Sequence, residues 1–158
     1  MTISSIKDIS KTVDRHKLYI LECNPNALSA SILAIQKQNI PVINMGKELA
    51  MYINSLEDYR YLNIDVYDFA KKLLDNKKTK INGVGNDIVA IYNLGILLEP
   101  TLELNAAKFL KEFSKSTAVI IIWENQTELP NILNWPTQKN NFNLNFSDIQ
   151  LNKLQNAI

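Results

Sequence analysis

The chain has 158 residues, of which 46% are hydrophobic and 21% are charged, and its formal net charge is +1 at pH 7. A chain of this length forms one domain that buries roughly 70% of the surface its unfolded form exposes, so it needs no disulfide or metal to fold. The near-zero charge excludes a long-range field that would attract nucleic acid, membranes or acidic ligands. Cys23 is the single cysteine and His16 the single histidine of the sequence, so an intrachain disulfide is excluded and a zinc site is disfavoured.

Two further features concern membranes and export. The first ten residues lack the apolar segment of a signal peptide. The longest apolar run, Ala118 to Trp123, falls far short of the ~18 residues that a membrane span needs. We therefore expect a cytoplasmic protein, in a bacterial cell, that makes no contact with a membrane.

The first half of the chain alternates short apolar runs with helical patterns. Residues 17–22 predict a buried strand, which the turn-forming residues 24–26 end. Residues 27–37 carry apolar side chains at helical spacing and predict a helix. Residues 40–45 predict a second strand, and residues 47–56 predict a second helix.

The middle of the chain continues the alternation. Asp65 is placed to cap a helix over residues 66–75, whose apolar residues recur on one face. Residues 76–86 are polar, contain two glycines and predict a surface loop. Residues 87–93 then predict a third strand that is apolar on both faces.

In the last third of the chain, the alternation of helical and strand patterns continues to residue 123 and then weakens. Residues 105–115 predict a helix, and the apolar run 117–123 predicts a strand more clearly than any other stretch of the chain. After a polar stretch, residues 142–146 alternate apolar and polar as a half-exposed edge strand does. Ser147 is placed to cap a terminal helix over residues 148–158.

This order of elements predicts the fold class. Strands that are apolar on both faces and alternate with helices indicate a three-layer α/β fold, with a mostly parallel sheet of about five strands between helices. We expect a single domain over residues 1–158, with its core in residues 16–147. In such folds, ligands bind at the carboxyl ends of the strands.

The first strand-to-helix turn is where a P-loop would lie. A P-loop reads G-x-x-x-x-G-K-[ST], because glycines let backbone amides surround phosphate while the Lys and hydroxyl hold phosphate and Mg²⁺. Glu22, Ala27 and Leu28 stand where the two glycines and the lysine belong, and Ser29 alone fits. A carboxylate ~4 Å from a phosphate charge costs about 4 kcal/mol. The candidate nucleotide-binding turn is therefore degenerate; it consists of Asn24, Pro25, Asn26, Ala27, Leu28 and Ser29.

The second nucleotide motif should place an Asp after the third strand as a Mg²⁺ ligand. Tyr92 and Asn93 stand at this position, and neither carries the charge that the ligand needs. Glu99 fits the pattern only beyond the end of the strand. We therefore expect no metal site and no catalytic residue. We also expect Tyr19 and Ile91 to lie on neighbouring parallel strands.

Five stretches of the chain carry a similarity to a known family: residues 39–45, 47–50, 91–102, 105–114 and 119–125. Together they resemble the BrxF family, small P-loop proteins of type-3 BREX phage-defence systems. The similarity covers most of the chain, from about residue 17 to residue 147. In that family the third strand runs into an Asp-Asn-x-Glu element, and here Tyr92 falls at the Asp and Gly95 at the Glu.

The resemblance implies a P-loop fold and a phage-defence setting. Members of the family are expected to bind ATP, whereas this chain lacks the loop glycines, the lysine and the acidic ligand. It is thus expected to be a pseudo-ATPase without cofactor, acting through contacts with other defence proteins or with itself. Two alternatives stay open. One is a subunit that binds ATP and Mg²⁺ through the helix amides, Ser29, and Asn24 or Asn26, and the other is a DNA-binding module.

The remaining candidate residues each have an ordinary structural explanation. A DNA-binding face would use the lysines between Lys71 and Lys80, although lysines also suit the end of a helix. Cys23 is expected to be a spectator thiol rather than a nucleophile. Tyr67 and Trp123 are expected to pack against other side chains. Trp135 is the candidate interface residue, since exposed tryptophans anchor protein partners.

Overall fold

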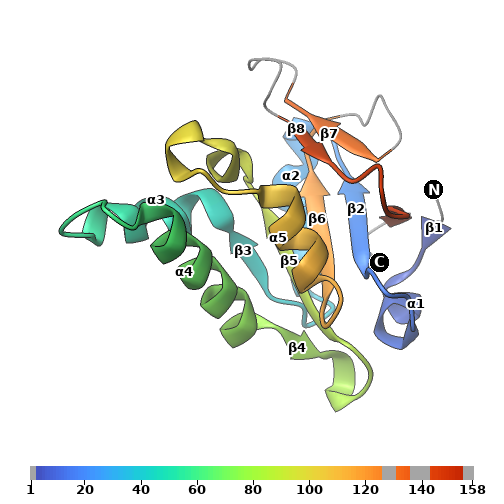
Figure 1. Cartoon of the computed structure of the whole chain (residues 1–158). Coiled ribbons are helices and arrows are strands. Elements are labelled where there is room, and N and C mark those ends of the chain that lie inside the picture. Colours follow the sequence, from blue (N-terminus) through green and yellow to red (C-terminus); the bar gives the residue numbers. More distant parts are fainter. Residues whose placement is uncertain (1–2, 126–130, 136–142, 155–158) are drawn as a thin grey trace.

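The computed structural model describes residues 3–125, 131–135 and 143–154, and it has a parallel sheet at its centre (Figure 1). The strand order is β1-β9-β2-β6-β5-β3, and every pair along this path is parallel. These strands are β1 (Ile3–Ser4), β2 (Leu18–Glu22), β3 (Val42–Asn44), β5 (Asp87–Tyr92), β6 (Ala118–Trp123) and β9 (Asn152–Leu154).

Helices cover both faces of the sheet. On one face lie α1 (Ile6–Lys11) and α2 (Leu28–Gln36), which bury Ile9 and Ile35 against one apolar cluster. The opposite face carries α3 (Met45–Ser55), α4 (Leu62–Lys77) and α5 (Ala106–Phe113), which pack on a second cluster. This arrangement confirms the predicted three-layer α/β fold. None of the helices in the described ranges is long and apolar enough to cross a membrane.

The central strands form where the sequence is most apolar. All six residues of β6 are buried, and β6 lies between β2 and β5. A strand covered on both faces needs apolar side chains at every position rather than at alternate ones. The strands predicted over residues 17–22, 40–45, 87–93 and 117–123 are confirmed within one or two residues, as are the helices predicted over residues 27–37, 47–56 and 105–115.

The predicted terminal helix is wrong where the structure describes it. Residues Asn152–Leu154 form β9, which pairs with β2 and β1. Leu151 packs in the cluster under α5, whereas Leu154 packs in the cluster on the other face. A strand satisfies the hydrogen-bonding groups of the otherwise open edge of β2, which a helix would leave unpaired. The core therefore extends beyond residues 16–147, since Ile9 is also fully buried.

Three other boundaries differ from the sequence-based expectation. The helix α4 begins at Leu62, so Asp65 lies in its first turn and does not cap it. The predicted loop 76–86 contains a short strand, β4 (Thr79–Lys80), antiparallel to β5. The predicted edge strand, β8 (Asn143–Asn145), pairs with β7 (Ile132–Asn134) in a separate two-stranded sheet rather than with the main one.

The expectation that Tyr19 and Ile91 lie on neighbouring strands is wrong. Both strands run parallel, but β6 separates them: Tyr19 is in register with Ile120, and Ile91 with Ile121. The most apolar strand takes the most buried place in the sheet, which local sequence patterns do not reveal. At about 4.8 Å per strand, the ends of β2 and β5 lie roughly 10 Å apart.

Candidate functional site

The turn after β2 has the predicted strand–turn–helix order, but its backbone hydrogen-bonds to itself. A 3-10 helix, Pro25–Ala27, runs directly into α2. The amide of Ala27 donates to the carbonyl of Asn24 at 2.8 Å, and the amide of Leu28 donates to the carbonyl of Pro25. Pro25 has no amide hydrogen to offer. The amides of Ala27 and Leu28 are therefore engaged within the turn, and Pro25 supplies none to a phosphate.

The backbone angles of this turn also differ from those of an anion-binding nest. Such nests alternate right-handed and left-handed residues so that successive amides converge on the anion. No residue from Cys23 to Ser29 has a positive φ; the positive-φ residues of the described chain all lie elsewhere. Leu28 is partly buried and packs on the core with Cys23, whereas Ser29 is exposed. The turn thus anchors α2 instead of presenting a concave amide surface.

Glu22, at the end of β2, forms an ion pair with a residue that the sequence analysis did not consider. Its carboxylate accepts a hydrogen bond from Lys153 Nζ, of β9, at 3.1 Å. The ammonium group of Lys153 reduces the repulsion between Glu22 and an anion. Because this ammonium group is paired with Glu22, it does not replace the missing P-loop lysine. The hollow between Glu22, Cys23, Asn24 and Asn125 has a volume of about 240 Å³. This is below the range of roughly 300–1,000 Å³ usual for small-molecule sites.

The thiol of Cys23 is not activated. Burial raises its pKa, although a hydrogen bond with Ser31 opposes this effect. A raised pKa keeps the thiol protonated at neutral pH, and only the thiolate is strongly nucleophilic. The environment of Cys23 is therefore that of a packed side chain.

Asn93, at the position of the lost acidic ligand, holds two elements together. Its side-chain amide donates to Asn44 Oδ1 at 2.8 Å, and the same oxygen caps α3 by accepting from the amide of Lys47 at 3.0 Å. A Cβ at Gly46 would lie 2.3 Å from Asn93 Nδ2, so only glycine permits this approach. Tyr92 packs on the opposite face of the sheet. Tyr92 and Asn93 therefore face opposite sides of the sheet, and β6 lies between their strand and β2.

The two tryptophans meet above the end of β6. Their rings are edge to face, with centroids 4.6 Å apart and planes at 88°. Trp123 is buried and Trp135 is partly buried against it. This contact, worth about 0.5–1.5 kcal/mol beyond area burial, gives both rings a structural role. Glu99 is exposed between two 3-10 helices, Gly95–Leu98 and Pro100–Leu102, and lies beyond the end of β5.

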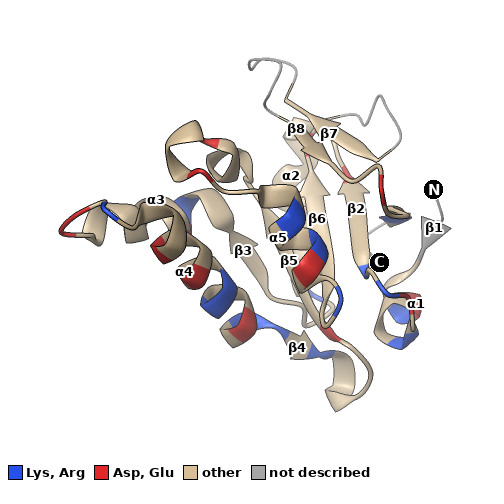
Figure 2. Cartoon of the chain, viewed as in Figure 1, with Lys and Arg blue, Asp and Glu red and all other residues tan. Residues whose placement is uncertain are grey.

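The lysines between α4 and β5 are partly neutralised. Lys78 lies 3.3 Å from Asp75 and 3.9 Å from Asp87, and Lys80 lies 3.1 Å from Asp87. Figure 2 shows acidic residues interspersed with the basic ones along α4 and β4. These exposed ion pairs add little stability, but they reduce the positive potential that binding to a phosphate backbone requires.

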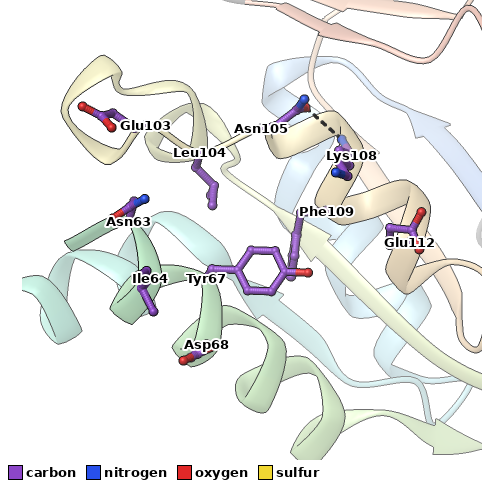
Figure 3. A pocket seen from close by; sticks show the side chains of 10 residues that line it. All are labelled: Asn63, Ile64, Tyr67, Asp68, Glu103, Leu104, Asn105, Lys108, Phe109 and Glu112. Carbon is purple, nitrogen blue, oxygen red and sulfur yellow. Dashed lines mark hydrogen bonds between the residues drawn. The ribbon is translucent and has the colours of Figure 1, made fainter. Parts of the chain in front are cut away.

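A larger cavity, of about 390 Å³, lies between α4 and α5. Tyr67 of α4 reaches across it toward Phe109 of α5, and Leu104 borders it from the preceding loop (Figure 3). The two aromatic rings are edge to face at 5.3 Å. Ile64, one turn before Tyr67, is 55% exposed. The cavity thus has an apolar lining that is open to solvent.

A second cavity, of about 250 Å³, continues the first along the same two helices. Both are lined by Tyr67, Phe109 and Glu112. We refer to the two together as the α4–α5 groove. Local sequence patterns did not indicate this groove, and Tyr67 was expected only to pack against other side chains. The available signal was that Ile64 and Tyr67 fall outside the inward stripe of Val66, Ala70 and Leu74.

The described residues hold no obvious inorganic site, and similarity to known proteins does not identify the chain. Within residues 3–125, 131–135 and 143–154, no three His, Cys, Asp or Glu side chains come together as metal ligands would. No family model matches the chain, and no curated protein or solved structure resembles it closely enough to count as a match.

Proposed function

We propose that this chain is a non-catalytic, P-loop-derived accessory subunit, a pseudo-ATPase that acts through protein contacts in a bacterial phage-defence system of the BREX type. The defence role rests on the sequence resemblance, and the cytoplasmic setting rests on the absence of a signal-peptide pattern and of a membrane-length apolar run in the sequence. The observation that carries the non-catalytic part is the turn between Cys23 and Ser29. It has no left-handed residue and no lysine, and its amides at Ala27 and Leu28 bond within the turn.

The charges at the carboxyl ends of β2 and β5 support the same proposal. ATP hydrolysis needs cations to balance a triphosphate and an ionised ligand for Mg²⁺. Lys153 is engaged by Glu22, and Asn93 is engaged by Asn44. Both polar groups therefore take part in contacts within the fold.

Exposed aromatic and aliphatic residues support a role in protein contacts. Tyr59, Tyr61 and Ile64 are each more than half exposed at or just before the start of α4, and Ile64 lines the groove together with Tyr67. Scattered apolar residues on a surface need no explanation, whereas a group of them beside a groove is typical of interaction sites. Tyrosine is also enriched among the residues that carry binding energy.

A thermal-shift experiment with nucleotides tests the proposal. A ligand at 100 times its Kd stabilises a protein by about 2.7 kcal/mol, which raises the Tm of a domain of this size by roughly 5–11 °C. We expect no change in Tm with millimolar ATP, ADP or GTP, with or without Mg²⁺. A rise of several degrees that needs Mg²⁺ would instead favour the alternative of a nucleotide-binding subunit.

A further inference from the structure

A cavity of about 410 Å³ lies between α1 and the segment 81–84, and it shares no lining residue with the α4–α5 groove. We infer that this α1 cavity binds an acidic segment of a partner protein, with an apolar side chain inside the cavity and Asp or Glu beside it. The inference rests on the proposed function, because it names a surface and a partner chemistry through which the chain would act. It is carried by the lining of the cavity, by the hydrogen bonds that join its walls and by its unpaired lysines.

Both walls of the cavity contribute apolar side chains. Ile6 comes from α1, and Ile81 and Val84 come from the facing segment. Ile6 is buried, whereas Val84 is 67% exposed. The volume falls within the range of roughly 300–1,000 Å³ that is usual for binding sites. A partner's apolar side chain placed there would cover Val84 and remove its surface from water at about 25 cal/mol per Å².

Hydrogen bonds hold the two walls together. The backbone amide of Asn86 donates to the carbonyl of Ser10 at 2.9 Å. Its side-chain amide donates to the carbonyls of Ile9 and Thr12 at 3.0 and 2.9 Å. Carbonyls at the end of a helix lack partners within it, so these bonds attach the segment firmly to α1. The cavity is therefore formed before a partner arrives, which lowers the entropy cost of binding.

The charges that line the cavity are of one sign. The ammonium groups of Lys7 and Lys11 line it, and no carboxylate of the described residues does. Both lysines are exposed, and neither forms an ion pair with a residue that the structure describes. They stand four residues apart on α1, a spacing that places two side chains on the same side of a helix.

The carboxylates that are close in sequence do not cancel this charge. Asp8 accepts hydrogen bonds from the amide and the hydroxyl of Ser5, at 3.2 and 2.9 Å. Asp87 is paired with two lysines, as described above. Asp14 lines a different cavity, together with Arg15. Even with Asp8 counted, the two lysines leave an excess of positive charge, which favours an acidic segment and disfavours a basic one.

The α4–α5 groove has no such excess. Among the described residues, its unpaired charges are the carboxylates of Asp68 and Glu103 and the ammonium groups of Lys71 and Lys108. Charge therefore defines the chemistry of a partner at the α1 cavity but not at the groove.

Site-specific photo-crosslinking in the native cells tests the inference with the full chain. A benzophenone amino acid is placed at Val84, which lines the cavity, and at Met51 or Tyr61, which are exposed on α3 and just before α4. The segment captured by each position is then sequenced by mass spectrometry. We expect Val84 to capture a segment in which an apolar residue is flanked by more Asp and Glu than Lys and Arg.

The other outcomes separate the two proposals. Capture at Val84 of a segment without this acidic excess, or of a second copy of this chain, overturns the inference and leaves protein contacts intact. Capture at Met51 or Tyr61 but not at Val84 has the same meaning. Capture at none of the three positions contradicts both the inference and the proposed function.

A binding measurement then tests the role of the two lysines. The probe is a synthetic peptide with the sequence of the segment captured at Val84. We expect Lys7→Gln combined with Lys11→Gln to weaken its binding by about tenfold, because two exposed ion pairs are lost. Glutamine and lysine have similar helix propensities, so α1 should still form.

The matched control combines Lys47→Gln with Lys72→Gln. Both residues are exposed and neither lines the cavity, so this equal change of charge should leave the affinity unchanged. Equal effects of the two double variants, or no effect of the first, would overturn the inference, because the lysines of the cavity would then have no specific role.

Discussion

The turn after β2 and the α4–α5 groove differ in how their polar groups are satisfied. In the turn, Ala27 and Leu28 bond to backbone carbonyls, and Glu22 at its start bonds to Lys153. In the groove, Asp68 and Glu103 have no ion-pair partner among the described residues, and the ring of Tyr67 is partly exposed. Groups that are satisfied internally stabilise a fold, whereas unsatisfied ones at the surface can bind another molecule. The contrast therefore favours the groove over the turn as a candidate binding surface.

Loss of a large side chain should separate the two regions most clearly. Trp123→Ala removes a buried ring from the end of β6, and we expect a loss of about 3–5 kcal/mol in the free energy of unfolding. Ile64→Ala, in the groove, should stay within about 0.5 kcal/mol of the parent. Urea denaturation of both variants measures the difference. Similar losses in the two variants would show that the groove is also part of the core.

The contact between Gly46 and Asn93 provides a sharper test of the sheet edge. We expect Gly46→Ala to cost about 1–3 kcal/mol, because its Cβ would lie 2.3 Å from Asn93 Nδ2. Asn93→Ala should make the same Gly46 substitution less costly by removing most of the clash. A double-mutant cycle by urea denaturation measures this coupling. If the two substitutions were simply additive, the structural role of Asn93 would be contradicted.

Restoring the P-loop lysine should not restore nucleotide binding. Leu28→Lys puts the cation at the motif position, but the side chain of Leu28 packs on the core. We expect a loss of roughly 1–2 kcal/mol in stability from the exposed apolar area. We also expect no heat of binding with ATP and Mg²⁺ in calorimetry. Saturable binding by the variant would mean that the turn lacks only charge and already has the shape of a phosphate cradle.

The smallest expected effect concerns Cys23. Because burial raises the pKa of its thiol, the thiolate fraction at a given pH is lower than that of a free thiol. Alkylation of the folded protein by iodoacetamide should therefore be slower than that of a small thiol, and it should rise with pH over a higher range. Alkylation faster than that of the small thiol at neutral pH would instead indicate an activated nucleophile.

The strands and helices that depend on local hydrophobic patterns were predicted from the sequence. The strands β2, β5 and β6 and the helices that follow β2 and β3 were predicted because hydrophobic periodicity determines them. The strand β9 was not, since Leu151 and Leu154 also fit one face of a helix, and pairing with the distant β2 decides the outcome. The place of β6 between β2 and β5 is equally non-local.

Of the two candidate sites, the turn after β2 could be predicted from the sequence and the α4–α5 groove could not. The position of the turn after β2 followed from the sequence, and its lost motif residues were evident there. Its internal hydrogen bonds were only partly evident, since Pro25 alone signals a missing amide. The α4–α5 groove depends on the separation of two helices that are distant in sequence, so no local pattern could reveal it. Exposed residues of a helix outside its inward stripe, such as Ile64 and Tyr67, are the signal to examine.

An NMR titration of the full chain with ATP and Mg²⁺ tests the central claim most directly, because it observes the amides of the turn one by one. We expect the amide signals from Asn24 to Ser29 to stay unchanged up to millimolar nucleotide, since Ala27 and Leu28 bond within the turn and Pro25 has no amide hydrogen. Saturable shifts concentrated in these residues would show that the turn opens to hold phosphate, and would contradict the account.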